Sequence, residues 1–225
     1  MAADTHSRAR LMSAILAAGI THWFGSEPAL EGVDLVVERG DHVAVLGDNG
    51  AGKTTLLRIL ATAMQPSAGG LEIMGLNARR EKRRLRARIG YLSHAPGLYP
   101  ALTAAENLAF FCDLRGVDRA RVPEALELMG LTQVARRRAA ELSRGLQQRL
   151  AIARATIHDP LLLILDEPDA SLDAEAPELL SRVMQKRTVV FATHDQALAA
   201  RLGHRTVQLR KGHVMGAGSR LHVVH

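Results

Sequence analysis

The residues best suited to chemistry begin with a glycine-rich segment, GDNGAGKT, at positions 47–54. It matches the pattern G-x-x-x-x-G-K-[ST] in full and lies between an apolar run and a segment with helical periodicity. Glycines let the backbone wrap tightly with its N–H groups directed inward, and a helix that starts there adds the positive end of its dipole. Lys53 supplies a cation for the β- and γ-phosphates, and the Thr54 hydroxyl can ligate Mg²⁺. The sequence therefore predicts a phosphate-binding loop made of Gly47, Asp48, Asn49, Gly50, Ala51, Gly52, Lys53, Thr54 and Thr55.

Two acids, Asp166 and Glu167, directly follow a second apolar run at 161–165. In a parallel α/β sheet, ligands bind at the edge formed by the carboxyl ends of the strands. We therefore predict that Asp166 holds Mg²⁺, directly or through a water, and that Glu167 polarises the water that attacks the γ-phosphate. His194 follows a third apolar run at 188–192, so it is expected at the same edge, where its imidazole can hydrogen-bond the γ-phosphate.

The elements that must position these residues are short and alternate in type, which predicts a central α/β unit with a helical insertion and no separate second domain. A helix is predicted from Lys53 to about Met64, with an apolar stripe along one face. A second helical region extends from 103 to 156 and opens with a capping box, Thr103 to Glu106. Strands are predicted at 15–21, 33–37, 43–46, 71–74, 89–92, 161–165, 188–192, 206–209 and 213–215.

Composition limits the class of protein. The hydrophobic fraction is 47% and the charged fraction 23%, as in an ordinary globular protein, and no apolar run approaches the roughly 20 residues that cross a bilayer. Cys112 is the only cysteine, which excludes an intramolecular disulfide and fits a reducing cytoplasm; we expect it to be an inert thiol in or near the core. Residues 1–12 are expected to be a flexible N-terminus rather than a cleaved signal, because Ser13 interrupts the apolar stretch.

The basic run Arg79–Arg88 accounts for much of the net charge of +6. Three interpretations stay open: a solvated helix face, a patch that faces lipid or a partner, or a nucleic-acid site. Aromatic residues make up only 3% of the chain, which is few for base-stacking platforms, so no nucleic-acid partner is expected.

Taken together, these residues resemble the ATP-binding cassette (ABC) family. The segment Leu142–Arg149, LSRGLQQR, occupies the place of the family's signature motif, just before a helix that leads to the strand with the two acids. Ala170–Asp173 is similar to its D-loop, His194 to its switch histidine, and Phe24 to the aromatic residue that stacks on adenine. The resemblance covers about residues 15–216.

The resemblance implies an ATP hydrolase coupled to transmembrane transport, with ATP and Mg²⁺ bound. It implies a P-loop NTPase core with a mainly parallel sheet, an antiparallel β subdomain and a helical insertion subdomain at about 96–155, within a nucleotide-binding domain at 13–220. It also implies a head-to-tail dimer that sandwiches nucleotide, in which Ser143 and the N–H groups near Gly145 form a second anion site at a helix start. Transmembrane permease subunits at the cytoplasmic face of the cell membrane are the implied partners.

The chain departs from the family pattern at two places. In the signature segment, Arg144 and Leu146 replace a Gly and a Gln; Arg144 either adds a cation near the γ-phosphate or points to solvent. His94 stands where the family has a Gln that senses Mg²⁺, and an imidazole can take that role but titrates near neutrality.

These departures are similar to the ATP-binding subunit of the cytochrome c biogenesis haem exporter. Three alternatives stay open: the ATPase subunit of another small-molecule or lipid exporter, a soluble ATPase that acts on nucleic acid or ribosomes, and a regulatory subunit with little turnover. A soluble ATPase that acts on nucleic acid or ribosomes usually carries two cassettes or a long coiled-coil insertion, neither of which is expected here.

Overall fold

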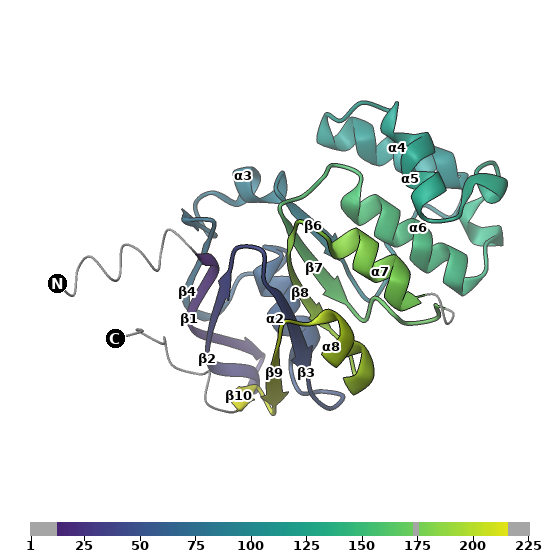
Figure 1. The fold of residues 1–225 in the computed structure, drawn as a ribbon. Coiled ribbons are helices and arrows are strands. Elements are labelled where there is room, and N and C mark those ends of the chain that lie inside the picture. Colours follow the sequence, from purple (N-terminus) through teal and green to yellow (C-terminus); the bar gives the residue numbers. More distant parts are fainter. Residues whose placement is uncertain (1–12, 173–175, 216–225) are drawn as a thin grey trace.

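The computed structural model describes residues 13–172 and 176–215, which form two sheets and the helices packed on them (Figure 1). Three of the sequence expectations fall outside these residues: the flexible N-terminus at 1–12, Asp173 of the D-loop, and the end of the predicted domain at 216–220. The predicted class is confirmed, because a mainly parallel sheet, an antiparallel sheet and a helical insertion are all present.

The first sheet is antiparallel, in the order β2-β1-β4-β5. Its strands are β1 (Ser13–Phe24), β2 (Glu27–Glu38), β4 (Ala68–Ile73) and β5 (Leu76–Asn77). The first two are longer than their apolar runs predict, because hairpin pairing continues through exposed residues as far as Phe24 opposite Glu27. Backbone pairing, rather than burial, thus extends this hairpin.

The second sheet is parallel except for its last strand, in the order β10-β9-β3-β8-β7-β6. Its strands are β3 (His42–Leu46), β6 (Ile89–Leu92), β7 (Leu162–Asp166), β8 (Thr188–Ala192), β9 (Arg205–Arg210) and β10 (His213–Met215). Successive side chains point to opposite faces of a strand, so each central strand contributes side chains to two hydrophobic cores, one on each face of the sheet. Leu163 and Leu165 pack on the helical side, whereas Leu162 and Ile164 pack toward the antiparallel sheet.

Helix α2 (Lys53–Leu60) lies in the core between the two sheets, with Leu56, Leu57, Ile59 and Leu60 buried. The prediction that this helix continues to Met64 is wrong. Thr62 adopts a left-handed conformation with φ of 57°, and this breaks the helical hydrogen-bond pattern after one turn fewer than the apolar periodicity suggests.

Helices α4 to α8 cover the other face of the parallel sheet, and α4, α5 and α6 gather at the upper right of Figure 1. Thr103 and Glu106 form the predicted capping box at the start of α4. Cys112 on α4 is a free, buried thiol, as expected. The elements are α4 (Ala104–Arg115), α5 (Arg121–Leu128), the short helices η1 (Thr132–Val134) and η2 (Ala139–Glu141), α6 (Arg144–Thr156), α7 (Ala176–Met184) and α8 (Gln196–Leu202).

Helix α3 (Lys82–Arg86) carries much of the basic run and precedes β6. Leu85 is fully buried and anchors it, while the arginines around it, from Arg79 to Arg88, are exposed. Most of the run is therefore an exposed basic surface. None of the helices in the described part of the chain has both the length and the apolar character that crossing a bilayer requires.

Candidate nucleotide-binding site

The phosphate loop links the end of β3 to the start of α2 and can be built only with glycine at two of its positions. A Cβ on Gly47 would lie 2.2 Å from the carbonyl oxygen of Leu209, and a Cβ on Gly52 would lie 2.5 Å from that of Ala29. Gly52 also has φ of 103°, a conformation that other residues rarely adopt. The loop is thus packed closely against backbone from β2 and β9.

Lys53 is folded back over this loop. Its side chain is 7% exposed, and its Nζ donates to the carbonyl oxygens of Gly47 at 2.7 Å and of Asp48 at 3.1 Å. A buried ammonium is stable only with such acceptors around it. The loop therefore combines a fixed positive charge with free backbone donors, an arrangement that suits a polyphosphate.

The phosphate loop meets the acids of β7 through one hydrogen bond. The Thr54 hydroxyl donates to Oδ1 of Asp166 at 3.2 Å. Asp166 is 2% exposed, and its Oδ2 is buried with no hydrogen-bond partner. Burial raises the pKa of this carboxyl, while the bond from Thr54 acts in the opposite direction. An unpartnered buried carboxylate oxygen next to a hydroxyl fits a hard divalent cation such as Mg²⁺.

Such a cation would take its other ligands from water or phosphate, as Mg²⁺ commonly does. Within residues 13–172 and 176–215, no group of three His, Cys, Asp or Glu side chains is placed to hold a metal ion. The donors at Thr54 and Asp166 are hard oxygen atoms, the type of ligand that Mg²⁺ binds.

Glu167 lies between the two histidines that the sequence singled out. Its Oε2 is 3.5 Å from Nδ1 of His94, and its Oε1 is 3.9 Å from Nδ1 of His194. Glu167 has φ of 50°, and this turn away from β7 brings its side chain out of the core. In the structure His94 therefore contacts Glu167. The role of His94 as a metal ligand, which the sequence predicts, stays a prediction.

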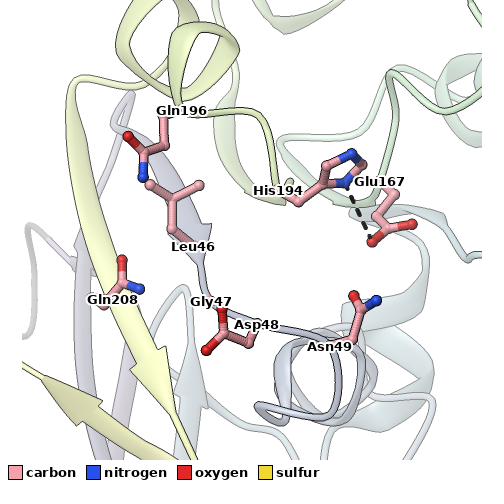
Figure 2. Close-up of a pocket in the computed structure, with 8 residues that line it drawn as sticks. All are labelled: Leu46, Gly47, Asp48, Asn49, Glu167, His194, Gln196 and Gln208. Atoms are coloured by element: carbon pink, nitrogen blue, oxygen red, sulfur yellow. Dashed lines mark ion pairs between the residues drawn. The ribbon is translucent and has the colours of Figure 1, made fainter.

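An open pocket of about 440 Å³ lies over the phosphate loop. Figure 2 shows Glu167 and His194 facing each other on one side of it, with Asn49 below them and Gln208 on the far side. The structure thus brings the loop, Glu167 and His194 together, as predicted. The full lining is Leu46, Gly47, Asp48, Asn49, Glu167, His194, Gln196 and Gln208.

The other loop residues sit close by. Ala51 is buried and donates its N–H to the carbonyl oxygen of Asp48 at 3.1 Å, which closes the turn around Gly50. Thr55 is in the first turn of α2 and is half-buried.

Of the predicted residues outside the phosphate loop, Phe24, Ser143 and Gly145 do not line this pocket, and neither do His94 and Asp166. Phe24, at the end of β1, is 51% exposed and makes an edge contact with His22. Ser143 caps the start of α6 by accepting a hydrogen bond from the N–H of Leu146 at 3.4 Å, so the predicted helix start is confirmed. Ser143 and Gly145 do not line the pocket, so within one chain the structure does not unite them with the phosphate loop.

Sequence reasoning missed several polar residues at this sheet edge. Gln196 and Gln208 line the pocket, and Asp169 accepts a hydrogen bond from the Thr193 hydroxyl at 3.3 Å, which joins the loops after β7 and β8. Burial raises the pKa of Asp169. Gln148 on α6 donates to the loop that carries Glu167. Of these residues, only Gln148 could have been singled out from the sequence, because it lies inside the signature segment.

The similarity of the chain to known proteins agrees with this geometry. Residues 30–170 match the sequence family described as ABC transporter. The chain is 34% identical over 201 residues to the ABC transporter ATP-binding protein NatA of Bacillus subtilis, which covers 85% of this chain and 82% of NatA. It is 37% identical over 212 residues to the lipoprotein-releasing system ATP-binding protein LolD of Bacteroides fragilis, covering 88% of this chain and 98% of LolD.

A solved structure, that of the dimeric ATP-binding cassette MJ0796 bound to ADP and Pi after hydrolysis, superposes with a TM-score of 0.84 at 29% identity. The match covers 92% of this chain and 99% of that one. This chain therefore belongs to the ABC transporter family. Within that family it is an ATP-binding subunit, an ATPase whose hydrolysis of ATP is coupled to transport.

Proposed function

We propose that the phosphate loop, the Thr54–Asp166 pair and Glu167 form the site at which Mg-ATP is hydrolysed to drive transport through separate membrane subunits. The observation that supports this most directly is the 3.2 Å hydrogen bond between Thr54 and Asp166. It joins the phosphate loop to Asp166, the last residue of β7, at the ligand-binding edge of the parallel sheet.

In hydrolysis, a water oxygen bonds to the γ-phosphorus, and the bond from that phosphorus to the β–γ bridging oxygen breaks, which yields ADP and phosphate. Glu167 orients the attacking water and accepts its proton. Lys53 holds the β- and γ-phosphates, and His194 hydrogen-bonds the γ-phosphate. Both Glu167 and His194 face the pocket over the loop, as these roles require.

Thr54 and Asp166 are the residues proposed to hold Mg²⁺. The buried and unpartnered Oδ2 of Asp166 supports this assignment, because a cation there offsets the cost of burying a carboxylate. Bound Mg²⁺ supplies positive charge to the phosphate oxygens. His94 is proposed as a further contributor to this metal environment, through its place beside Glu167.

The second half of each nucleotide site is proposed to come from another copy of the chain, head to tail. Ser143 is exposed at the start of α6, so the N–H groups of the first turn, near Gly145, are available to an anion. They do not line the chain's own pocket, so they are free to take a phosphate held by a second subunit. Phe24 is proposed to stack on the adenine, for which its exposed ring is suited.

The permease is proposed to dock on the surface formed by the segment after β6 and the outer face of α4, at the cytoplasmic side of the membrane. Tyr99, Phe110 and Leu114 are large apolar side chains that are 47%, 38% and 65% exposed there. The rings of Tyr99 and Phe110 contact each other with centroids 4.7 Å apart. Exposed aromatic and aliphatic groups of this kind suit a protein interface.

For the transported molecule, we propose haem, exported during cytochrome c biogenesis. The support is the pairing of His94 with the signature segment that reads SRGLQQR from Ser143 to Arg149. The alternative is another small-molecule or lipid exporter, and it is favoured by relatives such as LolD, whose name refers to lipoprotein release. Haem-stimulated ATP hydrolysis by the chain in complex with its membrane partners would support the first, and stimulation by lipid alone would support the second.

The test of the hydrolytic site is Glu167→Gln. This variant should bind ATP and form a stable dimer with it, yet hydrolyse little, because the amide cannot take a proton from water. Glu124→Gln, on an exposed position of α5, is the matched control and should keep normal turnover. Normal turnover in Glu167→Gln would contradict the proposed role.

A further inference from the structure

A buried amide on α6 holds the backbone beside Glu167. The side chain of Gln148 is 8% exposed, and its Nε2 donates to two consecutive carbonyl oxygens, those of Glu167 and Pro168, each at 3.2 Å. Both carbonyls belong to the loop that leaves β7. An amide nitrogen carries two hydrogens, so this one group can serve both acceptors.

This stretch of backbone needs such support. Glu167 has a left-handed conformation, with φ of 50°, which costs a non-glycine residue about 1 kcal/mol. Its N–H donates to the carbonyl oxygen of Ala192 at 3.0 Å, so β8 fixes one side of the residue. Pro168 follows and has no N–H to donate. The other side of Glu167 is held through carbonyl groups: that of Glu167 accepts from the N–H of Ala170 at 3.1 Å, and Gln148 is the side chain that binds the carbonyls of both Glu167 and Pro168.

Helix α6 contacts the same loop a second time. A Cβ on Gly145 would lie 2.8 Å from the carbonyl oxygen of Ser171, so the helix backbone and the loop are in close contact there. Positions 145 and 148 are three apart and share one face of the helix. This face of α6 thus follows the loop from Glu167 to Ser171.

From this geometry we infer that Gln148 is a positioning residue for ATP hydrolysis: its amide fixes the backbone of Glu167 and so the direction of the carboxylate. The inference rests on the proposed role of Glu167. Gln148 does not line the pocket and acts through Glu167. The first turn of α6 holds Gly145 and is capped by Ser143, the two residues proposed to bind a phosphate of the other subunit. The hydrogen bonds of Gln148 are therefore a tether that connects this helix to the orientation of the Glu167 carboxylate in the same chain.

The test compares two amides on one helix. Gln148→Met keeps the length of the side chain and removes both hydrogen bonds. Gln147→Met is the matched control, because Nε2 of Gln147 donates to the carbonyl oxygen of Ala139 at 2.8 Å, away from the β7 loop. A misplaced reactive group costs about 10- to 100-fold in rate, so kcat of Gln148→Met should fall by that factor with KM for ATP unchanged. The kcat of Gln147→Met should stay at the wild-type value.

A double-mutant cycle separates positioning from general damage to the fold. If Gln148 acts through the carboxylate of Glu167, then Gln148→Met should not slow single-turnover hydrolysis further in a Glu167→Gln background. An equal loss in both backgrounds would overturn the inference. Gln148→Ala provides a second variant if Gln148→Met fails to fold, and it should show the same loss in kcat and the same non-additivity.

These measurements also distinguish the inference from the proposed function. Normal hydrolysis by Glu167→Gln would remove the role of Glu167 and, with it, the reason for the tether. Little hydrolysis by Glu167→Gln together with wild-type kcat in folded Gln148→Met would overturn only the role of Gln148.

Discussion

Acidification should destabilise the chain through one half-buried imidazole, that of His158 in the segment between α6 and β7. Its Nε2 lies 3.1 Å from the carbonyl oxygen of Ile89 and donates to it in the neutral ring, while Nδ1 is buried without a partner. Burial, followed by the charge of Arg115, lowers the pKa of His158 from 6.5 to about 4. A proton on Nδ1 would therefore be a buried donor with no acceptor, close to a guanidinium.

The sign of the effect follows from where the proton binds. The unfolded chain takes up the proton near pH 6.5 and the folded chain only near pH 4, so unfolding is favoured as the pH falls between these values. Linkage gives a loss of about 2 kcal/mol in the free energy of unfolding between about pH 7.5 and about pH 5. The ring is partly exposed, and solvent reduces this to between about 1 and 2 kcal/mol. The contribution is complete above pH 6.5.

Urea denaturation at the two pH values would measure this loss, with His158→Gln as the comparison. Glutamine can keep the donor to Ile89 but does not titrate, so its free energy of unfolding should fall less with acid than that of the wild type. The difference between the two slopes isolates His158 from the other titrating groups, including His42, whose pKa is also lowered by burial. Identical acid sensitivity in the two proteins would refute this reasoning.

Three further predictions concern the site and its supports. Gly52→Ala should lower the thermal midpoint and abolish binding of a fluorescent ATP analogue, because its Cβ would meet a backbone carbonyl at 2.5 Å. Gly50→Ala bears a similar backbone strain, with φ of 78°, but its Cβ meets nothing within 4 Å, so it should bind better than Gly52→Ala. Asp166→Asn should melt higher than wild type without ligand, because it removes a buried charge whose pKa is raised, but should lose the stabilisation by Mg-ATP; a lower midpoint without ligand would contradict the assignment. Asn107→Ala should lower the free energy of unfolding, measured by urea denaturation, by about 2–4 kcal/mol. The reason is that Asn107 is fully buried and its side-chain amide both donates to and accepts from the backbone of the segment from Tyr99 to Thr103. A loss no larger than that of an ordinary surface substitution would refute this prediction.

Local patterns account for the parts of the fold that the sequence predicts well. The strands at 89–92 and 188–192 appear within those bounds, because an apolar run between polar breaks is sufficient to define a buried parallel strand. The capping box at Thr103 and the helix start at Ser143 are equally local, since each depends on contacts within one turn. The glycine pattern at 47–52 also predicts the phosphate loop, although the need for glycine at Gly47 and Gly52 comes from contacts with the distant backbone of Leu209 and Ala29.

Contacts between distant segments account for what the sequence does not predict. The distances from Glu167 to His94 and His194 depend on how β6, β7 and β8 lie side by side, and no spacing along the chain encodes them. The tether from Gln148 spans 19 and 20 residues and depends on the packing of α6 against the loop after β7. The left-handed φ of 57° at Thr62 ends α2, although its neighbours continue the apolar pattern.

The close approach of Gly145 to Ser171 affects how mutations in the signature segment can be interpreted. A variant with any side chain at 145 displaces the chain's own loop beside β7 as well as altering a surface offered to another subunit. Loss of activity in such a variant is therefore not evidence of a lost nucleotide contact. Substitutions at Ser143, which is exposed and accepts a hydrogen bond from the N–H of Leu146, alter the cap of α6 without placing a new side chain against Ser171.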